Sequence, residues 1–349
     1  MGYSRRANSS CTNKRITGGK LISRWWQQGH MDCGESKLIM LSRVAYQLYW
    51  MARYLERAED MARTVNVYTH FMMDLPKGAE IDWNVLINIT ENLTQVTQSK
   101  RKVSEQGALR YVISSSKNPA SIISSIKFAR ENVRTSRNML PSEVWEIINE
   151  LQNYVDEKAE KSVNRRNRFE FLSHITEKCQ LLNGHIMTTL CRDHTYKFIK
   201  LGHLIERADI TNRVIKSSAA AVSKRKSKNT TFDSLLWANI LSATSTLGAY
   251  RQIVGPMIDG HSVIDFLYKN RDLPRSIIFC IHGILRDLKS FTDNKKILSL
   301  TTKIQTRLLR FDVRGMAFED FDDFTTDLQN KIDTLDAMVY EILFDEGHV

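Results

Sequence analysis

Two short motifs hold the residues whose types and spacing suit acid–base or anion-binding chemistry. The first motif contains Glu56, Arg57, Glu59 and Arg63. On a helix with 100° between successive residues, both glutamates and Arg63 fall on one edge, and Arg57 points roughly the other way. Glu59 and Arg63 stand four residues apart, in the order that favours an ion pair. Such carboxylates can transfer protons, and guanidinium groups can hold a carboxylate or phosphate through two hydrogen bonds.

The same pattern occurs again 150 residues later. The members of this second motif are Glu206, Arg207, Asp209 and Arg213. A separate pair of segments, 118–126 and 273–281, shares the sequence Pro-x-Ser-Ile-Ile at a spacing of 155 residues. Two patterns repeated in the same order at nearly the same spacing predict a tandem duplication. We expect the two repeated halves to be residues 40–190 and 191–349.

A long helix over residues 41–73 is expected to position the first motif. Apolar residues recur every three or four positions along it and define one stripe: Val44, Leu48, Met51, Leu55, Ala58, Ala62 and Val65. The opposite side carries Tyr46, Trp50, Tyr54 and Met61. The helix is therefore expected to be buried on two sides, with Ser42 as its N-cap and residues 75–78 ending it.

The rest of the chain reads as further helices. In the first half they are expected over 81–99, 108–114, 120–138, from Pro141 onward, and 169–190. In the second half they are expected over 192–223, 231–253, 262–268, 274–291, 298–309 and 321–344. Five prolines and 15 glycines are few for 349 residues, and no segment alternates as a strand would. The predicted fold class is all-α, a multi-helix bundle built from the two duplicated halves.

The two motifs allow a structural and a functional interpretation. If the halves pack about a pseudo-twofold axis, Glu56, Glu59 and Arg63 would face Glu206, Asp209 and Arg213. The result would be a buried ion-pair network that fixes the register of the halves. Alternatively, Arg57 or Arg207 holds a carboxylate or phosphate in a ligand pocket. A charge run is ordinarily a solvated face, but the flanking aromatic residues argue against that here.

No metal, cofactor or catalytic constellation is expected. Di-iron helical bundles need Glu-x-x-His on two helices. Three positions after Glu59 the chain has Ala62, and three positions after Asp209 it has Asn212, so neither motif supplies the histidine. His203-x-x-Glu206 has the histidine before the acid, which is the reverse of the di-iron motif. In the first half, Arg53 stands at the position equivalent to His203. The chain also contains no Gly-x-Ser-x-Gly or Walker sequence.

Charge and cysteine usage limit the partners and the compartment. The formal net charge is +11, but residues 1–39 alone hold seven Lys or Arg against two Asp or Glu. Basic loops expected at 100–102, 165–168 and 224–228 lack a nucleic-acid reader fold, so we expect no nucleic-acid partner. No apolar run reaches the length of a membrane span. The five cysteines are scattered without Cys-x-x-Cys spacing, which fits a reducing cytoplasm, and Cys280 is expected in the core.

Residues 1–39 show no apolar periodicity and lack the apolar core of a secretory signal. We expect this segment to be a disordered basic extension. Its presence would follow from a translation start placed too early, with Met40 as the true first residue.

Several segments together resemble the bacterial alpha-E family. They are residues 40–45, the two Glu-Arg-Ala motifs, 129–132 followed by 143–145, and 265–267 leading to Pro274-Arg275-Ser276. The resemblance implies an all-helical protein of unknown biochemical function. It also implies genes encoded beside, or fused to, circularly permuted ATP-grasp and transglutaminase-like proteins, and therefore a system that forms peptide or amide bonds. It names no catalytic residue.

The sequence is consistent with two functions. The first is a non-catalytic cytoplasmic accessory protein that binds or positions a partner, an ATP-grasp-type ligase, or its substrate. The alternative is an enzyme whose acid–base residues lie in a cleft between the halves: Glu56, Glu59, Glu206 and Asp209. A sealed network of these side chains favours the first, and an open cleft favours the second. The oligomeric state stays open.

Overall fold

A computed structural model describes residues 34–73, 82–90, 103–223 and 230–344 of the chain. The described residues form helices and turns and contain no strand, so the all-α prediction is confirmed. Residues 1–41 and 42–349 are two compact units, and the account below concerns the second. Up to residue 189 the α-helices are α2 (Gly34–Met73), α3 (Asn84–Thr90), α4 (Glu105–Ile113), α5 (Ile122–Thr135), α6 (Ser142–Lys158) and α7 (Arg165–Thr189). Beyond it they are α8 (His194–Ser223), α9 (Thr230–Ala243), α10 (Leu247–Ile253), α11 (Gly260–Lys269), α12 (Ile277–Leu288), α13 (Lys295–Arg310) and α14 (Phe318–Leu343).

Helix α2 carries the first Glu-Arg motif and buries its apolar stripe as predicted. Six of the seven predicted positions, from Leu48 to Val65, are buried, and Val44 is half-buried. The aromatic side is covered less completely, since Tyr46 is exposed and Trp50 is half-buried. The predicted N-cap at Ser42 is wrong, because the helix already begins at Gly34. Residues 34–39 belong to α2, and residues 1–33 of the predicted basic extension lie outside the described part of the chain.

Helix α8 carries the second motif and passes very close to α2. A Cβ atom built on Gly202 of α8 would lie 2.3 Å from the backbone oxygen of Tyr49 and 3.1 Å from the Cβ of Ala52. Only glycine lets the two backbones approach to this distance. The motif side chains begin within a turn of this contact, so it sets the distance across which they meet.

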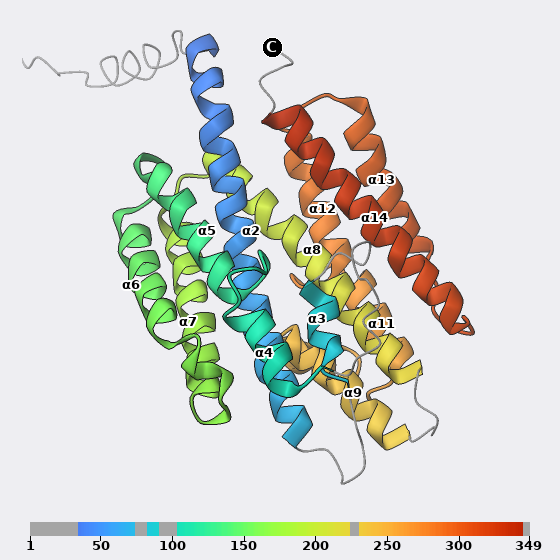
Figure 1. Cartoon of the computed structure of the whole chain (residues 1–349). Coiled ribbons are helices and arrows are strands. Elements are labelled where there is room, and N and C mark those ends of the chain that lie inside the picture. Colours follow the sequence, from blue (N-terminus) through green and yellow to red (C-terminus); the bar gives the residue numbers. More distant parts are fainter. Residues whose placement is uncertain (1–33, 74–81, 91–102, 224–229, 345–349) are drawn as a thin grey trace, which may run out of the picture. The chain divides into compact units, whose positions relative to one another are not determined.

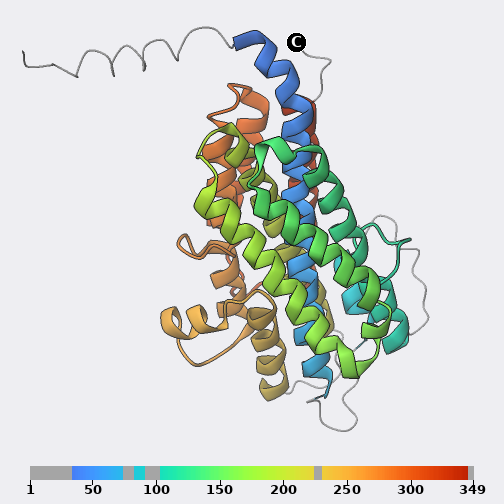
Figure 2. The same cartoon turned by 90° about the vertical axis from the view of Figure 1, so that its left-hand side faces the viewer.

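The remaining long helices pack around this pair. Figure 1 shows α5, α6 and α7 on one side of α2, and Figure 2 shows the same three helices in front of it. Helix α8 packs against α12 and α14, and α13 packs against both of these. Tyr54 of α2 contacts Phe128 of α5 at 5.2 Å between ring centroids. Both motifs therefore lie on helices that other helices cover.

Several helix ends differ from the sequence-based expectation because polar side chains end or start them. Residues 231–253 form two helices rather than one, and the break lies at Ser245, whose φ is 56°. The hydroxyls of Thr244 and Thr246 bond to backbone carbonyls beside it. Helix α5 begins after Ser121, whose hydroxyl accepts a hydrogen bond from the Ser124 amide, so Pro119 precedes the cap.

Two further expectations concern basic and apolar segments. Residues 165–168 are not a loop but the first turn of α7, where Arg165 and Arg168 both bind Glu105 of α4. The basic segments at 100–102 and 224–228 lie outside the described residues, as does the end of the helix expected over 81–99. Cys280 is buried, as expected. Among the described helices, none is both long and apolar enough to cross a membrane.

Candidate functional site

The carboxylate of Glu206 on α8 is held by two arginines of α2. Arg57 binds it with both arms of its guanidinium group, with Nε 2.5 Å from Oε1 and Nη2 2.9 Å from Oε2. Arg53, one turn earlier on the same helix, places its Nε 2.7 Å from Oε2. The guanidinium group of Arg53 also pairs with Asp336 of α14.

The carboxylate of Glu56 on α2 is held by α8 in the same way. Arg207 binds it bidentately, with Nε 2.7 Å from Oε1 and Nη2 3.0 Å from Oε2. His203 occupies the position that Arg53 has on α2, and its Nδ1 lies 3.0 Å from Oε2. Each Glu-Arg motif therefore gives its glutamate to the arginine of the other motif, across the interface between α2 and α8.

Burial and charge act in opposite directions on the two glutamates. The side chain of Glu56 is 0% exposed and that of Glu206 is 1% exposed. Burial alone would raise the pKa of Glu206, but Arg57 and Arg53 lower that pKa to about 2. Burial likewise opposes ionisation of Glu56, and the charges of Arg207 and Arg275 hold its pKa well below its usual range. Both carboxylates are therefore ionised at neutral pH.

Glu59 of the first motif and the neighbouring Asp60 form a second layer of acidic side chains on α2. Arg63 pairs with Glu59, as the four-residue spacing predicts, and with Asp60, whose Oδ1 is 2.9 Å from its Nη1. Gln180 of α7 donates a hydrogen bond of 3.3 Å to Glu59. Arg275, which precedes α12, joins the two layers, because it pairs with Asp60 and lies 3.1 Å from Glu56 and 3.2 Å from Glu59.

The second motif has a comparable layer on α8. Arg213 donates a hydrogen bond of 2.9 Å from Nε to Asp209, again at the four-residue spacing. Gln329 of α14 also donates to Asp209. Asn212 donates to the side-chain oxygen of Gln329 at 3.0 Å and accepts a hydrogen bond of 2.8 Å from the Tyr268 hydroxyl. These contacts tie α8 to α11 and α14.

The eight predicted site residues thus lie in one buried region, but their pairing differs from the expectation. The acids and Arg63 of the first motif do not face the matching set of the second. Instead, each central glutamate meets the other motif's arginine. Arg57, which the helical wheel directs away from Glu56, points to α8 and binds Glu206. Arg207 likewise points to α2 and binds Glu56.

Five further members of the cluster were not among the predicted site residues: Arg53, His203, Asp60, Arg275 and Asp336. The sequence held a signal for the first two, since they occupy equivalent positions 150 residues apart. Arg275 stands in the Pro-Arg-Ser segment that carries the family resemblance. No pattern marked Asp336, which α14 brings beside Arg53 and the Tyr49 hydroxyl.

The cluster has the form of a sealed network. Arg57 and Arg207 each keep 19% of their side-chain surface exposed, while the carboxylates between them are covered. Four pockets of 160 to 1300 Å³ in the described part of the chain are lined by other residues. The described residues also include no group of three or more His, Cys, Asp or Glu placed to hold a metal ion. Such an arrangement holds two helices in register and leaves its carboxylates poorly suited to giving up or taking a proton.

Acid is expected to weaken the fold through Glu206. The pKa of this carboxyl is about 2 in the folded chain, below its ordinary value of 4.5. A lowered pKa stabilises the fold fully above about pH 5, and this contribution of roughly 3 kcal/mol is lost as the pH falls toward 2. Urea unfolding at neutral and acidic pH measures it. Glu206→Gln, less stable at pH 7, should lose less on acidification, and an equal loss in both proteins would contradict the assignment.

A family model matches most of the chain. The model of Alpha-E, described as a predicted alpha-helical domain with a conserved ER motif, matches residues 40–344. Glu-Arg occurs twice in the chain, at 56–57 and 206–207, which are the two reciprocal pairs described above. Neither a curated protein nor a solved structure matches the chain. On the extent of the match and its helical description, the chain belongs to the Alpha-E family.

Proposed function

We propose that the chain is a non-catalytic helical accessory protein of an ATP-grasp-type amide or peptide ligase system. It would bind and position the ligase or its substrate. One observation carries the non-catalytic part of this proposal: the glutamate of each Glu-Arg motif is bound bidentately by the arginine of the other. The Glu and Arg side chains of the family's motif therefore bind each other within the chain.

The ionisation of the central glutamates supports the same conclusion. A general acid or base works best when its pKa lies near the working pH. The pKa of Glu206 is about 2, and that of Glu56 is also lowered. Neither carboxyl carries a proton to donate at neutral pH, and as bases both are weak. These properties disfavour the alternative of an enzyme that uses paired carboxylates.

The same contacts disfavour an anion pocket at the motif arginines. A carboxylate or phosphate ligand that bound Arg57 would have to displace Glu206, and one that bound Arg207 would have to displace Glu56. Either displacement takes the bidentate partner from a buried carboxylate, which is unfavourable. We therefore assign the cluster a structural role in joining α2 to α8, and we place ligand or partner binding elsewhere on the chain.

The proposed partner class rests on the family resemblance, and three features of the chain support its proposed organisation and location. The alpha-E resemblance implies ATP-grasp neighbours, and an accessory role is consistent with a sequence that holds no Gly-x-Ser-x-Gly or Walker motif. The reciprocal pairing at a spacing of 150 residues supports a tandem duplication within a domain of residues 40–349. The described cysteines, Cys179, Cys191 and Cys280, are free thiols, which supports a cytoplasmic location.

Co-purification tests the proposal directly. The tagged full chain is expressed with an ATP-grasp protein of the kind that the resemblance implies as its gene neighbour, and the eluate is resolved by size-exclusion chromatography. We expect a stable complex, and we expect amide-bond formation by the ligase to increase when the chain is added. Amide-bond formation by the chain alone would contradict the proposal, as would a ligase that neither binds the chain nor responds to it.

A further inference from the structure

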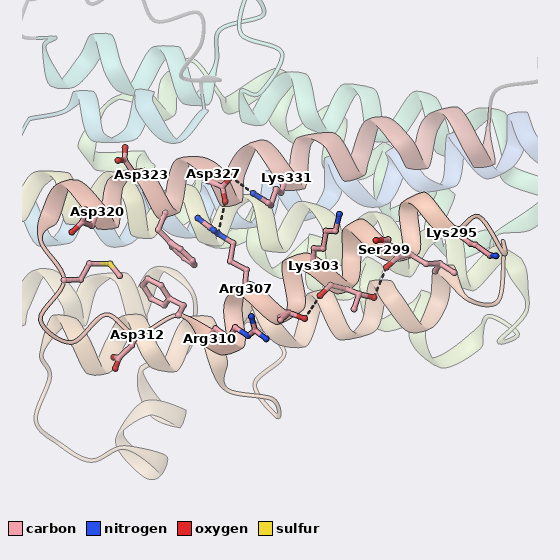
Figure 3. A pocket seen from close by; sticks show the side chains of 16 residues that line it. Lys295, Ser299, Lys303, Arg307, Arg310, Asp312, Asp320, Asp323, Asp327 and Lys331 are labelled. Carbon is pink, nitrogen blue, oxygen red and sulfur yellow. Dashed lines mark hydrogen bonds and ion pairs between the residues drawn. The ribbon is translucent and has the colours of Figure 1, made fainter.

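A groove of about 1300 Å³ runs between α13 and α14 (Figure 3), away from the Glu-Arg cluster. On α13 its lining residues recur every three or four positions, which places them on one helical face: Lys295, Ser299, Thr302, Lys303, Thr306, Arg307 and Arg310. On α14 the lining residues follow the same rule: Asp320, Asp323, Phe324, Asp327 and Lys331. Both helices therefore present a polar, charged face to the groove.

Part of the groove is apolar. The rings of Phe311 and Phe324 stack at 3.9 Å between centroids. The guanidinium group of Arg307 lies over the Phe324 ring at 5.2 Å, and its Nε is 2.8 Å from Asp327. Leu298 and Met316 add further apolar surface. The two phenylalanine side chains are only 5% and 7% exposed, so they form the floor of the groove, and the half-buried Leu298 and Met316 supply its accessible apolar surface.

The charges are separated along the groove. Figure 3 shows Asp312, Asp320 and Asp323 at the end where α13 leads into α14, and Lys303 and Lys295 toward the other end. All five side chains are exposed, and none forms an ion pair with another described residue. Between the two ends lie Arg310 and the mutually paired side chains of Arg307, Asp327 and Lys331. The groove thus has an acidic end and a basic end whose charges are free to meet a ligand.

We propose that this groove binds an extended peptide segment of a partner protein, with basic side chains at one end of the segment and acidic side chains at the other. Lys295 and Arg310 are 15 residues apart on α13, which corresponds to about 22 Å at 1.5 Å per residue. An extended chain of about seven residues covers that distance at roughly 3.3 Å per residue. Lys or Arg of the segment meets Asp320 and Asp323, apolar residues meet the half-buried Leu298 or Met316, and Asp or Glu meets Lys303 and Lys295. The inference rests on the proposed function only in naming a protein partner.

Two synthetic peptides of the same composition test the charge arrangement. The first has two arginines, three apolar residues and two glutamates in that order, and the second has the same residues with alternating charges. Fluorescence anisotropy with the full chain at low salt measures both affinities. We expect the first peptide to bind at least about tenfold more tightly, because only its charges match both ends of the groove. Equal affinities would overturn the proposal.

Charge reversal in the groove supplies a second test. Asp320→Lys with Asp323→Lys makes both ends basic, and we expect the affinity for the first peptide to fall at least about tenfold. Adding Lys295→Asp and Lys303→Asp reverses the polarity and restores the net charge. The peptide is then expected to regain its affinity by binding in the opposite direction. All four positions are exposed, so the fold is retained. Failure of the fourfold variant to regain binding would contradict the proposal.

The outcomes separate this inference from the proposed function. If the peptides fail to discriminate but the chain still co-purifies with the ligase, the groove assignment falls and the accessory role stands. If the peptides bind as expected but no ligase is captured, the accessory role falls and the groove assignment stands. If the chain dimerises and the charge-reversed variants abolish the dimer, the groove belongs to a second copy, which also overturns the proposal.

Discussion

Replacing Arg207 with alanine is expected to lower the free energy of unfolding by about 3 kcal/mol, the lower end for breaking a buried ion pair, because a buried carboxylate loses its bidentate partner. The carboxylate here is that of Glu56, which is fully buried and receives both arms of the Arg207 guanidinium group. Arg275 and His203 remain beside it, but neither binds it bidentately. Arg57→Ala should have a similar effect through Glu206. Urea unfolding followed by circular dichroism measures both.

A matched control is Arg110→Ala. Arg110 pairs with Glu160 at 2.9 Å, but its side chain is 57% exposed. Exposed pairs of this kind contribute at most about 1 kcal/mol. If Arg207→Ala destabilises no more than Arg110→Ala while partner binding is lost, the structural interpretation of the cluster is wrong. The arginines would then belong to a binding pocket.

Gly202→Ala is expected to destabilise the fold by about 2 to 3 kcal/mol, near the upper end for overpacking of a core. The added Cβ would lie 2.3 Å from the Tyr49 backbone oxygen, and a backbone atom cannot swing aside as a side chain can. Helices α2 and α8 must therefore separate. This separation also lengthens the neighbouring contact between His203 and Glu56. Chemical denaturation gives the stability, and the His203 imidazole resonances report the altered contact.

Gly184→Ala is the matched control for that variant. Gly184 lies in the interior of α7, and a Cβ there would have no atom within 4 Å. The substitution should raise the free energy of unfolding by about 0.5 to 1 kcal/mol, because alanine favours the helix over glycine. An equal change in the two variants would show that α2 and α8 do not need the close contact.

The all-α fold and the location of the cluster could be predicted because they depend on short-range patterns. The stripe from Leu48 to Val65 identifies a buried helix, and the recurrence of Glu-Arg marks two equivalent positions. The ion pair between Glu59 and Arg63 follows from a spacing of four residues on one helix. Each of these features is fixed within a single helix.

The pairing across helices could not be predicted because it depends on how two helices cross. Glu56 and Arg57 are adjacent in sequence, and which residue of α8 each of them meets depends on how α2 and α8 cross near Gly202. Arg275 lies just before α12 and Asp336 lies on α14. Both are far in sequence from the residues they bind, so the helical periodicity of α2 does not identify them. The break at Ser245 depends on hydroxyl groups that compete with the helix for its carbonyls.

A double-mutant cycle on Glu56 and Arg207, each changed to glutamine, tests reciprocal pairing most directly. Direct contact predicts a coupling energy of about 1.5 to 3 kcal/mol for this pair. The same cycle on Glu56 and Arg57, which are adjacent in sequence but bind different partners, should give a smaller coupling energy. Additivity for Glu56 and Arg207, or stronger coupling between the sequence neighbours, would contradict the exchange of glutamates between the two helices.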